Sequence, residues 1–131
     1  MRKALLMGAL ALSCATVAAA TEWTKTGATD EGGDMYVDLQ SIHRDGATLQ
    51  VSALVNFPGI LPKAEGHTIG STRLRFEFDC ASSRSRLIHA TAYSGRMESG
   101  DVIADTDAND PTLEPIQKGP LQDVLPLVCS K

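Results

Sequence analysis

The chain has 131 residues, 43% of them hydrophobic, and a formal net charge of −4 at pH 7. This length and composition allow one domain with a modest core. The acidic balance makes nucleic acids and anionic membrane surfaces poor partners for it. No segment after residue 20 approaches the run of about 20 apolar residues that a membrane-spanning helix needs.

Residues 1–20 have the organisation of a secretory signal peptide. Two basic residues precede a mostly apolar stretch, and three alanines at positions 18–20 end it. Cleavage at this point would leave residues 21–131 as one domain with a net charge of −6, because both of these basic residues are removed. We therefore expect an exported protein, with a lipid anchor at Cys14 as the alternative.

Alternation of apolar and polar residues predicts an antiparallel sheet of about six short strands. Trp23 falls in the first predicted strand, and residues 35–39 form the second. Apolar side chains then alternate over residues 48–57. Pro58 predicts the end of this strand, so residues 58–70 are expected to form a long loop.

The clearest alternation runs over residues 73–80, whose inward side chains would be Leu74, Phe76, Phe78 and Cys80. A short connection leads to a less regular strand over residues 86–93, which has apolar groups on both faces. A last strand is expected at Val102 and Ile103, followed by an irregular segment over residues 104–120. Short strands with small turns between them predict a meander.

Helical spacing follows near the C-terminus, where the apolar residues are Leu121, Val124, Leu125 and Val128. Proline is tolerated in the first turn of a helix but not in its interior. We therefore expect Asp123 to be the N-cap, which puts Pro126 in the first turn. A disulfide between Cys80 and Cys129 would tie this helix to the core face of the sheet. The predicted fold class is therefore α+β, a single antiparallel meander with a C-terminal helix held by a disulfide.

Residues that could carry chemistry do not assemble a catalytic or metal site. None of the three histidines has metal-ligand spacing to another: His43, His67 and His89. Residues 105–110 resemble the start of a calcium loop, but Asp110 stands where the loop needs glycine and Ile116 where it needs glutamate. We expect a solvated acidic loop there, with weak calcium binding left open, and we expect no enzyme activity, metal or cofactor.

Basic residues gather on the predicted hairpin over residues 73–93 and just beyond it. Arginine is enriched at protein interfaces, and a basic cluster on an acidic domain can attract acidic partners. The candidate protein-binding residues are Arg73, Arg75, Arg84, Arg86, Ser94 and Arg96. The alternative is a solvated face that Glu77 and Asp79 partly neutralise.

Several short motifs, taken in order, resemble those of the surface-adhesin protein E family: Trp23, Tyr36-Val37-Asp38, Ser41-Ile42, Arg44-Asp45-Gly46, Gly70-Ser71, Phe76-Glu77-Phe78-Asp79-Cys80, Arg84 to Arg86, Tyr93-Ser94-Gly95 and Val128-Cys129. The resemblance covers nearly all of residues 21–131. It implies an antiparallel sheet with a C-terminal helix tied to it by a disulfide. It also implies adhesion to host matrix and serum proteins such as vitronectin and laminin at a bacterial surface. The expected location is the periplasm or the cell surface of a Gram-negative bacterium.

Two functions from different classes follow. The first is a non-enzymatic adhesin-like module that binds a protein ligand such as a host extracellular matrix protein. The second is a periplasmic inhibitor of a cell-wall hydrolase such as lysozyme, which would insert the loop from Ser94 to Arg96 into the enzyme's cleft. Serine and arginine there could engage catalytic carboxylates. Neither function needs a cofactor or a nucleic acid, and both leave homodimerisation open.

Overall fold

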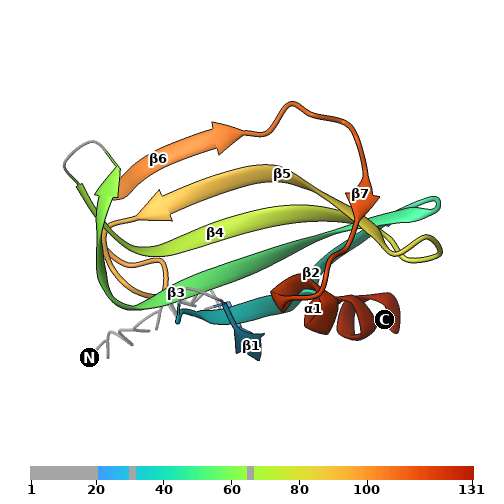
Figure 1. Cartoon of the computed structure of the whole chain (residues 1–131), viewed down its shortest axis with the longest axis horizontal. Helices are drawn as coiled ribbons and strands as arrows, with labels where there is room; N and C mark the ends of the chain where they lie inside the picture. Colours follow the sequence, from blue (N-terminus) through green and yellow to red (C-terminus); the bar gives the residue numbers. More distant parts are fainter. Residues whose placement is uncertain (1–20, 30–31, 65–66) are drawn as a thin grey trace, which may run out of the picture.

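The computed structural model describes residues 21–29, 32–64 and 67–131, which form one curved antiparallel sheet and one helix (Figure 1). The elements are β1 (Thr24–Ala28), β2 (Asp34–Asp45), β3 (Thr48–Ala64), β4 (His67–Asp79), β5 (Arg84–Tyr93), β6 (Val102–Asp107), β7 (Glu114–Pro115) and α1 (Pro120–Cys129). Strands β1 to β6 pair in chain order, and β7 pairs with β5. The predicted α+β meander is confirmed, whereas the predicted signal peptide lies outside the described residues.

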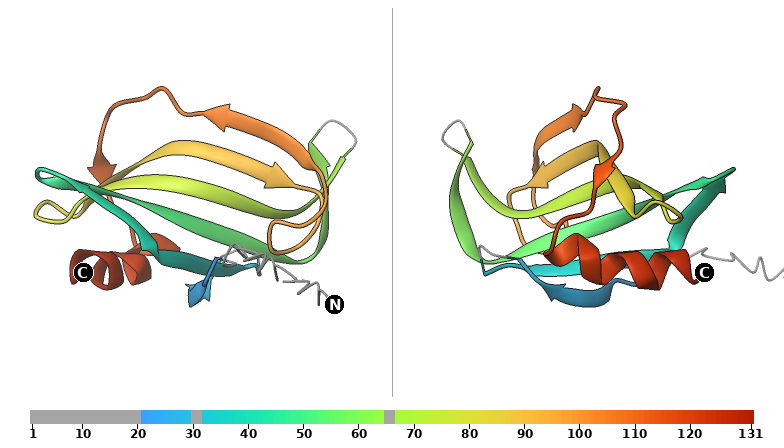
Figure 2. Two further views of the ribbon diagram at one scale, coloured as in Figure 1. Left: turned by 180° about the vertical axis from the view of Figure 1, so that it is seen from behind. Right: turned by 45° about the vertical axis from the view of Figure 1, so that its right-hand side comes forward.

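The core lies between one face of the sheet and helix α1. Alternate side chains of β3 and β4 face it, and the register places Val51 opposite Phe76 and Leu49 opposite Phe78. All four are buried, as the alternation predicts. The helix contributes Val124 and Val128, both fully buried, and lies against β1 and β2 (Figure 2).

The predicted disulfide is confirmed. Cys80 directly follows β4 and Cys129 ends α1, with their Cα atoms 5.8 Å apart. The two cysteines are 49 residues apart in the sequence. Closing a loop of this length removes enough chain entropy from the unfolded state to stabilise the fold by about 4 kcal/mol. In the described part of the chain no helix is long and apolar enough to cross a membrane.

The helix begins earlier than predicted, so the expected N-cap at Asp123 is wrong. Gly119 is the N-cap and Pro120 the first helical residue. Proline suits this position because its fixed φ matches the helix and its missing amide hydrogen would have no partner there. Pro126 therefore lies inside the helix, where it leaves the carbonyl of Gln122 without its usual donor. Both residues are exposed, so water can hydrate that carbonyl.

The long loop predicted over residues 58–70 is also wrong. Strand β3 continues to Ala64 and β4 begins at His67, with a register shift between Asn56 and Leu61. Pro58 falls in this bulge, where a missing amide hydrogen breaks no ladder hydrogen bond. In the same way β6 reaches Asp107, although the sequence predicted an irregular segment from residue 104 onward.

Candidate protein-binding site

The structure spreads the candidate residues along the length of the β4–β5 hairpin. Arg84 and Arg86 lie beside its turn, and Arg75 lies near its middle. The far end brings together three other candidates: Arg73, Ser94 and Arg96. Arg73 pairs in register with Thr91, five strand residues beyond Arg86, or roughly 17 Å along the strand. The candidates therefore do not form one basic patch.

Three of these arginines already have partners within the domain. Arg86 pairs with Glu77 at 3.1 Å, and Arg73 pairs with Glu98 at the same distance. Arg75 donates hydrogen bonds of 3.1 and 3.2 Å to two side chains of β3, those of Gln50 and Ser52. The register places all three residues on the polar face of the sheet, opposite Phe76 and Phe78, although Arg86, at the sheet edge, also lines a groove beside Phe76. Their hydrogen bonds hold that face together and leave them less available to a partner.

The connection between β5 and β6, residues 94–101, folds back onto this polar face (Figure 2); we call it the β5–β6 loop. The Ser71 hydroxyl donates to the carbonyl of Gly95 at 2.7 Å and accepts the amide hydrogen of Glu98 at 3.0 Å. Gly70 lies directly beneath the loop, since a Cβ there would sit only 2.4 Å from the carbonyl carbon of Gly95. Glycine is thus required for the two backbones to approach so closely.

A second buried side chain holds the tip of the loop. The Asn56 side-chain oxygen accepts the amide hydrogen of Met97 at 2.9 Å, and Asn56 is only 3% exposed. Met97 and Glu98 have φ values of 52° and 63°, a region that costs a non-glycine residue roughly 1 kcal/mol or more. The hydrogen bonds to the sheet offset this strain. The side chains of Arg96 and Met97 are exposed at the tip, Met97 by 42%.

Ser94 closes the loop instead of presenting its hydroxyl to solvent. Its amide donates to the carbonyl of Asp101 at 2.9 Å, and its hydroxyl oxygen accepts the amide hydrogen of Asp101 at 2.8 Å. The residue is half-buried. Of the two candidates in this loop, Arg96 is the one whose side chain faces outward.

Arg73 connects the loop to the segment just before β1. Its guanidinium lies 5.8 Å from the ring centroid of Trp23 while it pairs with Glu98. A cation–π contact at a partly exposed site contributes about 0.5 to 1 kcal/mol. We call the resulting surface the loop site and define it by five residues: Trp23, Arg73, Arg96, Met97 and Glu98.

The sequence analysis missed a paired histidine on the same face. His89 of β5 places its Nε2 2.5 Å from Asp105 Oδ1 and its Nδ1 2.6 Å from Asp107 Oδ1, both on β6. Hydrogen bonds to Asp107 and then Asp105 raise the pKa of His89 above 6.5. The hydrogen bond from Thr91, followed by that from His89, lowers the pKa of Asp105 below 3.8. Asp105 and Asp107 thus belong to a strand, although they were expected in a solvated loop.

The pairing of His89 with two aspartates could have been found only once the β5–β6 register was known. Residues two apart in a strand share a face, so Asp105 and Asp107 can flank one histidine on the neighbouring strand. Within residues 21–29, 32–64 and 67–131, no group of three or more His, Cys, Asp or Glu is arranged to hold a metal ion.

Comparisons with known proteins agree with this architecture. The family model for surface-adhesin protein E matches residues 23–130. A structure of Haemophilus influenzae protein E superposes with a TM-score of 0.60 at 16% identity, covering 87% of this chain and 91% of that chain. A structure of protein E from non-typeable Haemophilus influenzae gives 0.59 at 15% identity, covering 88% and 79%.

At these identities the structural likeness shows a shared fold. No curated protein sequence matches the chain. The family model, in contrast, spans all the described elements from β1 to α1. The chain therefore belongs to the surface-adhesin protein E family.

Proposed function

We propose that this domain is an exported, non-enzymatic module that binds another protein, as an adhesin does, and that it contacts its partner through the loop site. One observation carries the proposal: the buried side chains of Asn56 and Ser71 hold the β5–β6 loop in a single strained conformation on the sheet. A loop that is already ordered loses little conformational entropy when it binds.

The chemistry of the loop tip suits a protein partner. Arginine is enriched at interfaces, and methionine adapts its shape to an apolar surface. Among the ion pairs of the described residues, none includes Arg96, so its charge is available to a carboxylate on a partner. Since the family is named for adhesion, a host extracellular matrix protein is the first partner to test. Display at the cell surface would follow from that function.

The alternative function, inhibition of a cell-wall hydrolase, uses the same loop but requires it to enter the enzyme's cleft. Ser94 cannot separate the two functions, because its hydroxyl oxygen closes the loop and its replacement would disturb either kind of binding. Arg96 separates them better. An inhibitor that inserts Arg96 beside catalytic carboxylates would lose its effect on lysozyme in Arg96→Ala, whereas an adhesin would not inhibit lysozyme at all.

The proposal is tested by immobilising residues 21–131 and capturing partners from serum and from bacterial envelope extract, followed by mass identification. The double variant Arg96→Ala, Met97→Ser should lose the captured protein, and Arg84→Glu at the other end of the hairpin is the matched comparison. Arg84 is exposed and makes one long hydrogen bond, 3.4 Å to the carbonyl of Leu113. Capture that is lost in Arg84→Glu but retained in the double variant would place the site at the turn and contradict the loop site.

Location is tested separately by adding protease to intact cells. Digestion of the domain without permeabilisation would support display at the surface. Protection until the outer membrane is opened would place it in the periplasm, where the inhibitor alternative operates.

A further inference from the structure

The tip of the β5–β6 loop carries the exposed methionine of the domain. Residues 21–131 contain two methionines. Met35 lies in the core and is only 4% exposed, whereas Met97 is 42% exposed. Cys80 and Cys129 are bonded to each other, so neither offers a thiol to an oxidant. Oxidation of methionine follows exposure, so the sulfur of Met97 is the one in this domain that an oxidant reaches first.

The backbone at Met97 limits which apolar side chains fit there. Its φ of 52° lies in the left-handed region, which residues with a branch at Cβ rarely adopt. Methionine and leucine have no branch at Cβ, so either can supply an apolar side chain at the tip. Among the described residues three large hydrophobic side chains are exposed, and two of them, Met97 and Val102, lie in this loop or directly after it. Methionine at this position therefore gives the tip an apolar surface that can be oxidised.

The fold of the loop does not depend on the sulfur of Met97. Asn56 holds Met97 through its backbone amide, at 2.9 Å. The Ser71 hydroxyl likewise bonds only backbone groups of the loop, the carbonyl of Gly95 and the amide of Glu98. A chemical change at the end of the Met97 side chain therefore leaves these three hydrogen bonds in place. The polarity of the tip can change while its backbone conformation stays the same.

We propose that Met97 is a redox-sensitive modification site: hydroperoxides oxidise it to methionine sulfoxide, and the sulfoxide weakens binding at the loop site. Methionine is a flexible apolar side chain, and its sulfoxide is polar, so the modified tip loses its apolar contact with a partner. Methionine sulfoxide reductases reverse this oxidation, so binding can be restored. The inference rests on the proposed function, because it concerns the regulation of the same site.

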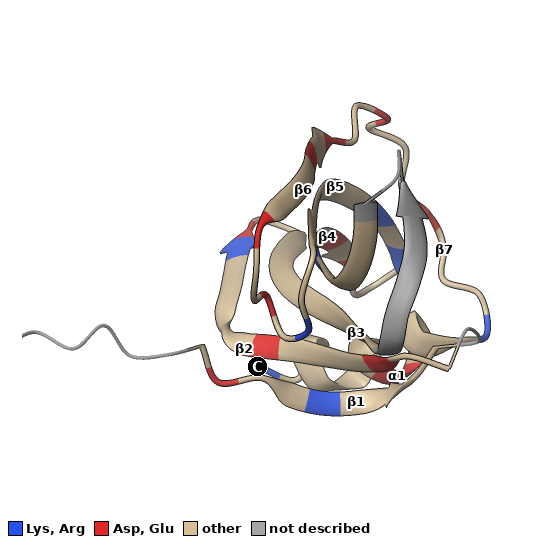
Figure 3. Ribbon diagram, turned by 90° about the vertical axis from the view of Figure 1, so that its left-hand side faces the viewer, with Lys and Arg blue, Asp and Glu red and all other residues tan. Residues whose placement is uncertain are grey.

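The reaction transfers one oxygen atom and two electrons. The thioether sulfur attacks the terminal oxygen of the hydroperoxide, so that an S–O bond forms and the O–O bond breaks. The sulfur is oxidised, and the hydroperoxide is reduced to an alcohol, or to water when it is hydrogen peroxide. The proton of the attacked oxygen passes to the leaving oxygen. Hydrogen peroxide carries no charge, so the acidic positions along β6 (Figure 3) have little effect on its approach.

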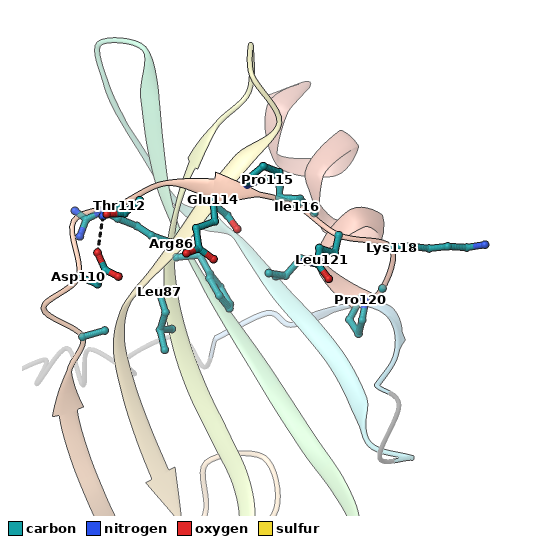
Figure 4. Close-up of a pocket in the computed structure, with 15 residues that line it drawn as sticks. Arg86, Leu87, Asp110, Thr112, Glu114, Pro115, Ile116, Lys118, Pro120 and Leu121 are labelled. Carbon is teal, nitrogen blue, oxygen red and sulfur yellow. Dashed lines mark hydrogen bonds between the residues drawn. The ribbon is translucent and has the colours of Figure 1, made fainter.

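The apolar groove at the other end of the hairpin does not share this chemistry. It has a volume of about 510 Å³ and lies between β5 and the chain that leads from β6 to α1 (Figure 4). Its large apolar side chains are Phe76, Leu87, Ile116 and Leu121, and none of the described residues that line it is a methionine or a cysteine. Peroxide therefore changes the apolar surface at the loop tip and not in the groove.

The first test measures where hydrogen peroxide reacts with residues 21–131. Trypsin cleaves after Arg96 and so places the two methionines in different peptides, and mass spectrometry follows the gain of one oxygen atom in each. Met97 should oxidise at least about tenfold faster than Met35, because Met35 is reached only when the core opens. Equal rates for the two methionines would overturn the proposal.

The second test asks whether oxidation changes the tip without releasing the loop, and it needs no partner. Retention of the folded domain on a phenyl resin should fall after peroxide, while hydrogen exchange at the amides of Met97 and Glu98 stays the same. Met97→Leu keeps an apolar side chain that peroxide does not oxidise, so its retention should not change on treatment. Met35→Leu still contains Met97 and should respond like the native domain. An equal fall in Met97→Leu, or faster exchange at the two amides, would contradict the proposal.

The third test measures capture of the partner. The oxidised native domain should capture about fivefold less of the protein that the untreated domain captures, as expected for one lost apolar contact, and a methionine sulfoxide reductase should restore it. Capture by Met97→Leu, compared before and after peroxide, should not change. If the double variant Arg96→Ala, Met97→Ser loses the partner but the oxidised domain retains it, the regulation is wrong and the proposed function stands. If the native domain captures no partner, the proposed function is wrong, and the first two tests still decide whether Met97 is the modification site.

Discussion

Replacing Gly70 with alanine should release the β5–β6 loop from the sheet. The added Cβ would lie 2.4 and 2.6 Å from the carbonyl carbon and oxygen of Gly95, and 2.8 Å from the amide nitrogen of Arg96. These are backbone atoms, so no side-chain rotation can relieve the overlap. The loop must move away by about 1 Å to restore ordinary contact distances, which would break the hydrogen bonds that Ser71 and Asn56 make to it.

The expected loss of stability is about 2 kcal/mol. Release of the loop relieves the overlap, which would otherwise cost about 1 to 3 kcal/mol, but it loses three hydrogen bonds with a net loss of about 1 kcal/mol each, or about 3 kcal/mol together. The freedom that the released loop regains offsets part of this sum. A change of this size should lower Tm by about 10 °C in a domain of this length. Urea unfolding followed by circular dichroism measures the free energy, and hydrogen exchange at Met97 and Glu98 reports release of the loop.

Gly27→Ala is the matched control. The atom nearest to its added Cβ is a carboxylate oxygen of Asp123 at 3.2 Å, which belongs to a side chain that can turn away. This variant should change stability by less than about 0.5 kcal/mol. If Gly70→Ala is as stable as this control and keeps the amides of Met97 and Glu98 protected, the β5–β6 loop is not held in the manner described.

Three further predictions concern the core, the disulfide and pH. Phe78 is fully buried, so Phe78→Ala should lower the free energy of unfolding by about 3 to 5 kcal/mol, and a loss below about 1 kcal/mol would contradict the assignment of the core face. Reduction of the Cys80–Cys129 bond should lower it by about 4 kcal/mol, whereas free thiols trapped by alkylation of the unreduced protein would show that the bond does not form. The raised pKa of His89 means that the folded state favours its protonated form. The stability that protonated His89 contributes is therefore fully present below pH 6.5 and is lost as pH rises through the raised pKa. Thermal unfolding should show this loss on the alkaline side in the native chain but not in His89→Gln, and an NMR titration of His89 with an ordinary pKa would contradict its pairing with the two aspartates.

The sequence predicts the fold well where one periodicity dominates. Strict alternation over residues 73–80 places Phe78 in the core, and helical spacing at the C-terminus places Val124 and Val128 against it. The disulfide follows from these two assignments. Two of the errors arise where proline was taken to end or exclude an element. Pro58 is accommodated by a bulge and Pro126 by burial of neighbouring helical side chains, and both are tertiary effects.

The loop site was less predictable, because it depends on contacts between distant residues. Asn56 and Met97, which hold the loop tip together, are 41 residues apart. One local signal was present: Leu54 breaks the alternation of β3. In the structure Leu54 is fully buried on the polar face, with Tyr36 and Arg73 as its cross-strand neighbours. An apolar residue on the polar side of a strand indicated that this face is covered too.

Helix α1 is the last element of the chain, yet it packs against β1 and β2, the first two. A chain that emerges with its N-terminus first therefore displays the apolar side of its early strands, including Val37 and Leu49, until residues 120–129 arrive. Cys80 also remains a free thiol until Cys129, which lies 49 residues later in the chain, has emerged. The core can therefore be completed only after the C-terminal residues have emerged. During that interval the uncovered apolar strands are the kind of surface that chaperones bind.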